Sequence, residues 1–222
     1  MKKIINKKLR PFYHADQGKD MTKLAIIFEI LRAFVTLGKN AQGFNDPLST
    51  GIMGLIFFVL VFSVTKYVYP IKLKDLGLKE RAQWSKSEML LMLILVPILT
   101  VVLFYITGDK VKLSLQENGF TLFMITCLCY FLWGFYMQWI YRGFLQTEFT
   151  RRYGPLTAII ISTLLFMIGS IHLFHLFDYS LFVIALLFVF ELFFGFLFYK
   201  TYNLWIVATL HGIAYCFLAV LQ

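Results

Sequence analysis

The sequence predicts an all-α fold: a polytopic membrane bundle of about seven transmembrane helices, with the N-terminus inside the cell and the C-terminus outside. Of its 222 residues, 59% are hydrophobic, whereas a soluble domain is about 45–50% apolar. The apolar residues form continuous runs, and a run of roughly 20 residues spans the hydrocarbon core of a bilayer as a helix. Because the runs do not alternate with polar residues, they favour helices over strands.

The positive charge of the chain fits membrane topology better than nucleic-acid binding. The net charge is +9, but it is divided between the N-terminus and several short loops, as the positive-inside rule requires. We therefore predict the lipid bilayer, and no nucleic acid, as a partner. All three cysteines lie inside apolar runs, where they pack as small apolar side chains and give no disulfide framework. They are Cys127, Cys129 and Cys216.

The chain divides into a basic cytoplasmic arm, residues 1–23, and a single transmembrane domain, residues 24–222. The first expected span, 24–38, is short and contains Glu29 and Arg32. These side chains are three residues apart and share one helix face. Three readings stay open: an ion pair facing other helices, a helix that lies in the interface, or a functional carboxylate.

Six further spans follow the first. They are expected at 51–69, 88–107, 119–141, 155–176, 180–199 and 204–221. Pro97 predicts a kink, Pro155 a helix start, residues 108–118 a loop, and residues 177–178 a very short turn. Seven crossings place most Lys and Arg on the inside, which supports the N-in, C-out orientation. The richness in Phe and Lys points to a bacterium, and hence to a multi-pass protein of the bacterial plasma membrane.

Ionisable residues inside the apolar runs are the candidates for function, because burying them in a membrane is costly. They are Glu29, Arg32, Arg142, His172, His175, Glu191 and His211. Three classes of function could use them. The first is metal-assisted or water-mediated hydrolysis, the second is transport or proton relay, and the third is a structural or regulatory role in which the groups only form hydrogen bonds between helices.

Four segments carry a family resemblance. The stretch Met137-Gln138-Trp139-Ile140-Tyr141-Arg142-Gly143 is followed by His172, with Phe166 upstream of it. Next come a glycine-containing helix and turn, Gly195 to Trp205, and then His211 to Tyr215. In order and spacing, these segments resemble the CPBP family of intramembrane metalloproteases, also called CAAX-processing and bacteriocin-processing or Abi proteins. The resemblance covers about residues 85–222.

The resemblance implies a catalytic site from which this chain departs. The family pattern begins with a Glu-Glu pair, three intervening residues and an Arg. The second motif is Phe-x-x-x-His, and the third is His-x-x-x-Asn or His-x-x-x-Asp. The first Glu and the second-motif His activate water, the last His and Asn stabilise the oxyanion, and the Arg holds the second Glu. Here Met137 and Gln138 replace the two Glu, and Tyr215 replaces the Asn. A thioether cannot accept the proton of an attacking water.

The site residues follow from this comparison. Candidate catalytic residues are His172, His211, Tyr215 and Glu191, of which Glu191 could supply the missing carboxylate. Candidate substrate-binding residues are Met137, Gln138 and Arg142. His172 and His211 are the candidate metal ligands. Because a third protein ligand is missing, we expect no certain cofactor and at most a weak zinc site.

We therefore expect a CPBP-like membrane protein with a degenerate protease site, inactive or weakly active. Its function would be to bind or regulate a membrane-embedded peptide or protein, with bacteriocin immunity as one form. The cavity walls would include aromatic residues, namely Trp133, Phe135, Trp139, Phe166 and Trp205. An active endopeptidase that uses Glu191 is the alternative, and a small transporter is a third reading. The sequence predicts no oligomeric state.

Overall fold

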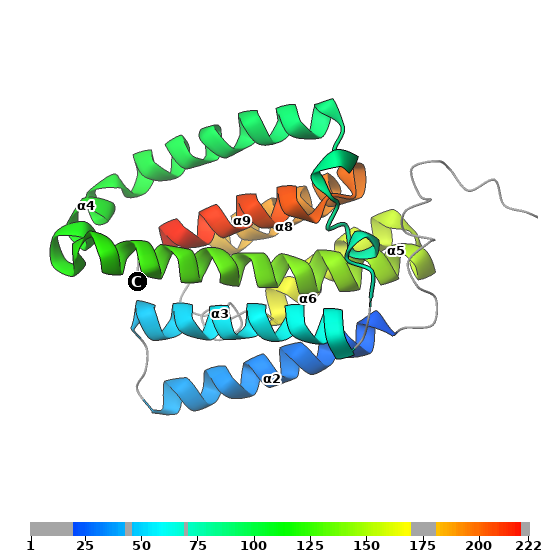
Figure 1. The fold of residues 1–222 in the computed structure, drawn as a ribbon, viewed down its shortest axis with the longest axis horizontal. Coiled ribbons are helices and arrows are strands. Elements are labelled where there is room, and N and C mark those ends of the chain that lie inside the picture. The colour runs from blue at the N-terminus through cyan, green and yellow to red at the C-terminus, as the bar shows by residue number, and fades with distance from the viewer. Residues whose placement is uncertain (1–19, 43–45, 69–70, 170–180, 219–222) are drawn as a thin grey trace, which may run out of the picture.

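The computed structural model describes residues 20–42, 46–68, 71–169 and 181–218, and these residues form helices and turns with no strand (Figure 1). This confirms the all-α fold. Two helices begin the chain, α2 (Met21–Ala41) and α3 (Pro47–Ser63). Asp46 caps α3 by accepting a hydrogen bond from the Ser49 amide at 2.8 Å, and Pro47 occupies the first turn, where no amide donor is needed. A π-helical turn, η1 (Val64–Val68), extends α3.

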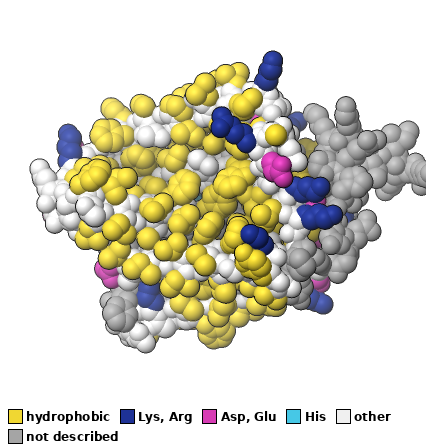
Figure 2. Space-filling view, in the orientation of Figure 1, with side chains coloured by type: hydrophobic (Ala, Val, Ile, Leu, Met, Phe, Trp, Pro, Cys, Tyr) yellow, Lys and Arg dark blue, Asp and Glu magenta, His cyan; other side chains and the backbone are white. Residues whose placement is uncertain are grey.

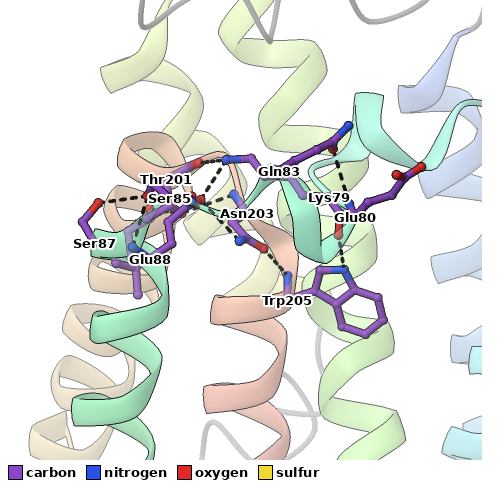
Figure 3. A network of polar contacts seen from close by, with 10 residues as sticks. Lys79, Glu80, Gln83, Ser85, Ser87, Glu88, Thr201, Asn203 and Trp205 are labelled. Atoms are coloured by element: carbon purple, nitrogen blue, oxygen red, sulfur yellow. Dashed lines mark hydrogen bonds and ion pairs between the residues drawn. The ribbon is translucent and has the colours of Figure 1, made fainter.

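A compact segment joins α3 to α4, and its side chains form hydrogen bonds with the turn between α8 and α9. It contains two 3-10 turns, η2 (Leu73–Leu76) and η3 (Arg81–Gln83). Lys79 Nζ donates to Glu88 Oε1 and to the carbonyl oxygen of Thr201, both at 2.7 Å, and Asn203 Nδ2 also donates to Glu88 at 3.3 Å (Figure 3). Glu88 also completes a capping box with Ser85 at the start of α4. This clamp fixes the segment against the turn between α8 and α9.

Helix α4 (Lys86–Gln138) corrects the predicted loop at residues 108–118, which are helical. The only non-helical residue within α4 is Gly119, with φ 70° and ψ 161°. A glycine adopts this conformation without steric cost, so a single residue reverses the chain and no loop is required. The two halves of α4 are therefore two separate helices joined by this turn (Figure 1).

The second half of α4 forms the centre of the bundle. It continues through a π-helix, η4 (Trp139–Gln146), into α5 (Thr147–Tyr153). Then follow α6 (Pro155–Gly169), α8 (Leu181–Thr201) and α9 (Leu204–Leu218). A Cβ placed on Gly134 would lie 2.8 Å from the Gly212 Cα. The two glycines thus allow α4 and α9 to approach closely.

Two helical stretches are long and apolar enough to cross a membrane: Leu48–Val68 and Lys86–Tyr153. The second has 68 residues, and a straight helix of that length would be about 100 Å long. The turn at Gly119 folds it back on itself. The other predicted spans coincide with α2, α6, α8 and α9 over their described residues. Seven crossings and the N-in orientation stay predictions, and the basic arm before residue 20 and the turn at 177–178 lie outside the described residues.

Candidate functional site

A buried polar cluster lies at the centre of the bundle, where α4, η4, α6, α8 and α9 meet. Four side chains form its core: Gln138, Arg142, Glu191 and His211. Gln138 and Arg142 are completely buried, while Glu191 and His211 are 4% and 5% exposed. Gln138 and Arg142 are four residues apart and therefore point to the same side. Glu191 and His211 come from α8 and α9.

Arg142 is the most heavily bonded member of this cluster. Its Nη2 donates to Glu191 Oε2 at 2.8 Å and to the Glu191 backbone oxygen at 2.7 Å. Its Nη1 donates to Ser162 Oγ at 2.8 Å and to Gln146 Oε1 at 3.2 Å, and Thr163 Oγ1 lies 3.3 Å from both Nη atoms. Because a buried charge is costly unless it is paired and hydrogen-bonded, this set of contacts holds Glu191 as the counter-ion of Arg142.

Gln138 lies between the carboxylate and the imidazole. Its Nε2 lies 3.4 and 3.3 Å from the two Glu191 oxygens, and it also contacts His211 Nδ1. Glu191 Oε1 and His211 Nδ1 are 3.7 Å apart, which is longer than a direct hydrogen bond. The amide of Gln138 therefore occupies the position from which a water would contact both groups.

Aromatic rings enclose the imidazole of His211. The ring of Phe194 stacks on it with centroids 5.6 Å apart, and Phe166 and Tyr215 approach to 5.4 and 4.6 Å. Tyr215, predicted to replace the oxyanion Asn, is thus adjacent to His211 with its ring in an edge-to-face arrangement. The rings leave His211 with little exposure to anything outside the bundle.

The structure brings together five of the predicted site residues: Gln138, Arg142, Glu191, His211 and Tyr215. Met137 is 1% exposed and packs in the hydrophobic core, where its thioether offers no charge to the cluster. His172 and His175 lie outside the described residues, so their positions relative to His211 stay predictions.

Three members of the cluster, Gln146, Ser162 and Thr163, escaped the sequence analysis because they carry no charge. For Gln146 a signal existed: it follows Gln138 and Arg142 at the same four-residue interval. Its Nε2 donates to the Gly195 backbone oxygen at 2.7 Å. Ser162 and Thr163 gave no comparable pattern in an otherwise apolar helix.

A second buried polar cluster surrounds Glu29 and Arg32. Arg32 Nη2 donates to Glu29 Oε2 at 2.8 Å and also to the Gly169 carbonyl oxygen. Tyr136 and Tyr141 donate their hydroxyls to Glu29 at 3.1 and 2.7 Å. Of the three readings of this pair, the contacts agree with an ion pair that faces other helices.

The donors of the central cluster do not suit a metal ion. Among the residues that the structure describes, no three His, Cys, Asp or Glu side chains come together in a way that could hold one. The one carboxylate is already paired with Arg142, whose positive charge would repel a divalent cation. The Nδ1 atom of His211 is in contact with Gln138.

A cavity of about 900 Å³ lies beside the cluster and is separate from it. Of the five aromatic residues predicted for the cavity walls, Phe135, Trp139 and Trp205 line it, whereas Trp133 and Phe166 do not. The polar side chains of the cluster are also absent from its lining. In the described part of the chain, the polar cluster and this apolar cavity are thus two different features.

Comparison with known families agrees with the predicted resemblance. Residues 119–217 match the family model described as type II CAAX prenyl endopeptidase Rce1-like. The matched segment begins at the turn in α4 and ends within α9, so it contains every residue of the central cluster. No curated protein and no solved structure gave a match to the chain.

Proposed function

We propose that this chain keeps the scaffold of a CAAX-type protease but acts by binding, because residues 119–217 match the model of the Rce1-like type II CAAX prenyl endopeptidases, a family of membrane proteins. Its partner would be a membrane-embedded peptide or protein, and a bacteriocin-type peptide is the first class to test. One observation carries the proposal. The only carboxylate in the described cluster is neutralised by Arg142, and Gln138 separates it from His211.

The chemistry of the cluster supports a role without catalysis. A general base must reach the proton that it removes, either directly or through one water. Glu191 accepts from Arg142 at 2.8 Å, and both of its oxygens also contact Gln138. Met137 offers no basic atom at the position where the family has its first Glu. Loss of a positioned base typically lowers a rate by a factor of about 100 to 10,000.

Active proteolysis by means of Glu191 is the second candidate, and the 3.7 Å separation of Glu191 Oε1 and His211 Nδ1 favours it. A side-chain rotation of Gln138 would admit a water between the two groups. The histidine and the carboxylate would then act together on that water. The two candidates differ in one requirement: only the second needs the charge on Glu191 for activity.

Cleavage of a panel of membrane peptides and prenylated peptides by the purified protein would separate the candidates. The wild type would be compared with Glu191→Gln, His211→Ala and a restored variant. Restoration needs three changes, Met137→Glu, Gln138→Glu and Glu191→Gln, because a carboxylate at 138 would otherwise stand about 3.3 Å from that of Glu191.

We expect no cleavage by the wild type and measurable cleavage by the restored triple variant. The same triple variant with His211→Ala serves as the control and should be inactive. Cleavage by the wild type that disappears in both Glu191→Gln and His211→Ala would refute the proposal and establish the second candidate. Binding would be measured in parallel by photo-crosslinking of the same peptides to the wild type in vesicles.

A further inference from the structure

The apolar cavity beside the cluster is built from three helix faces. On α4, its lining residues follow the spacing of one helical face: Met89, Met92, Leu93, Val96 and Pro97. On α3 the lining residues are Phe58 and Phe62, one turn apart, and on the central helix they are Phe135 and Trp139, also one turn apart. Each wall thus comes from a rigid element. An apolar space holds ordered water poorly, so in a bilayer an apolar membrane component is the natural occupant of this cavity.

The depth of the cavity fits one leaflet of a bilayer. Met89 to Pro97 covers nine residues of α4, and the first and last of them lie about 12 Å apart along the helix. Half of the hydrocarbon core is about 15 Å. A transmembrane segment of a partner would need contacts across the whole thickness, whereas a single lipid chain needs only half. The cavity begins at the η2–η3 segment, where Lys79 and Trp84 line it, and extends to Phe135 and Trp139 on the central helix.

The rim of the cavity carries an arginine whose side chain forms no ion pair with the described residues. Lys79, Glu80 and Arg81 lie at this rim. Lys79 is paired with Glu88 at 2.7 Å, and Glu80 caps η3. No hydrogen bond or ion pair connects the exposed Arg81 side chain to the described residues. Figure 2 shows most Lys and Arg side chains of this face toward the same end of the molecule, with apolar side chains over its middle.

Two indole donors in the lining lack partners. Trp139 is 1% exposed, and its Nε1 has no hydrogen-bond acceptor among the described residues; the same holds for the Nε1 of Trp84 near the rim. A buried donor without an acceptor costs free energy. Because both nitrogen atoms are themselves buried, a ligand with ester oxygens would reach them only after a rotation of the indole rings.

We infer that this cavity binds one anionic phospholipid. Its phosphate lies near Arg81, its ester region lies near Trp84, and an acyl chain runs between α3 and the first half of α4 toward Phe135. Basic pockets next to transmembrane helices bind anionic headgroups in this manner. The inference goes beyond the proposed function and does not depend on it, because the lipid fills the cavity whether or not the protein cuts a peptide.

Quenching of tryptophan fluorescence by brominated lipid tests the inference, because three of the four tryptophans line the cavity: Trp84, Trp139 and Trp205. The full-length protein would be reconstituted in phosphatidylcholine vesicles. Increasing fractions of phosphatidylglycerol or phosphatidylcholine with dibrominated acyl chains would then be added. We expect saturable quenching, with about fivefold preference for phosphatidylglycerol, the contribution of one basic residue near an anionic headgroup.

Two matched pairs of variants locate the site. Arg81→Gln should remove the preference for phosphatidylglycerol, while Lys74→Gln, an exposed lysine of the same segment outside the lining, should keep it. Val96→Phe narrows the cavity and should weaken quenching by both lipids. Val101→Phe, on the same helix but outside the lining, should leave it unchanged.

Equal quenching by the two lipids in the wild type would overturn the inference, as would identical behaviour of Arg81→Gln and Lys74→Gln. Displacement of the brominated lipid by an equimolar prenylated peptide would also overturn it, because the cavity would then be a peptide site. None of these measurements records cleavage. A failed lipid inference is therefore distinguishable from a failed proposal of function.

Discussion

Replacing Glu191 with leucine should destabilise this protein more than any exposed substitution. Arg142 is completely buried and donates to the Glu191 carboxylate at 2.8 Å. Removing one partner of such a pair leaves a buried charge without its counter-ion, which typically costs about 3–5 kcal/mol. Arg142→Met should cost a similar amount, because the buried Glu191 carboxylate then loses the cation that donates to it at 2.8 Å.

The double variant Glu191→Leu with Arg142→Met distinguishes an ion pair from simple packing. Both charges are then absent, so the loss should be no larger than that of either single variant, which gives a coupling of about 3 kcal/mol or more. Ser162 keeps a partner in the double variant, the Ile159 carbonyl oxygen at 3.2 Å. The free energy lost because the Ser162 hydroxyl no longer accepts from Arg142 should therefore be small.

Reversible unfolding in mixed detergent micelles, followed by tryptophan fluorescence, measures these free energies. The exposed pair Asp109 and Lys112, with N and O atoms 3.7 Å apart, is the matched control, and its double-mutant cycle should show no measurable coupling because solvent screens it. Additive losses in the buried cycle, as in the exposed one, would refute the claim that Arg142 and Glu191 hold the central helices together as a charge pair.

Two further predictions concern packing and capping. Gly212→Leu should destabilise the bundle by about 1–3 kcal/mol in the same micelle assay, because even a Cβ there would lie 2.7 Å from the Phe131 ring; an unchanged midpoint would show that α9 can shift. Asp46→Ala should cost about 1 kcal/mol as a lost helix cap, and this cost should shrink in acid. The backbone hydrogen bond from Ser49 lowers the pKa of Asp46, so the stability it adds is present above its unfolded pKa and is lost as the pH falls through the lowered value.

The helices were largely predictable because they follow from continuous apolar runs and local signals. Asp46 and Pro47 mark the start of α3, and Pro155 marks that of α6. The predicted loop at 108–118 was wrong because polar residues do not by themselves indicate irregular structure. That stretch is rich in lysine, leucine, glutamine and glutamate, which are good helix formers. The turn depends instead on one residue, Gly119.

The sequence predicts which residues belong to the central cluster more readily than which of them contact each other. An arginine, a glutamate and a histidine inside apolar runs already indicate a costly site. Which of them meet depends on how α4, α8 and α9 are rotated, and no local pattern encodes that rotation. The cavity could not be predicted at all, since its walls come from segments far apart in the chain and consist of residues that look like ordinary membrane-facing side chains.

The contacts of Arg142 suggest why a degenerate first motif is compatible with a stable bundle. The family resemblance implies that this arginine holds a carboxylate from its own helix, at the position of Gln138. Here the carboxylate comes from α8 instead, and Gln138 donates to it. An uncharged residue at 138 is then required, because two carboxylates about 3.3 Å apart would repel each other. We infer that Glu191 takes over the support that a glutamate at 138 would give to the fold. Under the proposed binding function, the same pairing keeps its carboxylate out of catalysis.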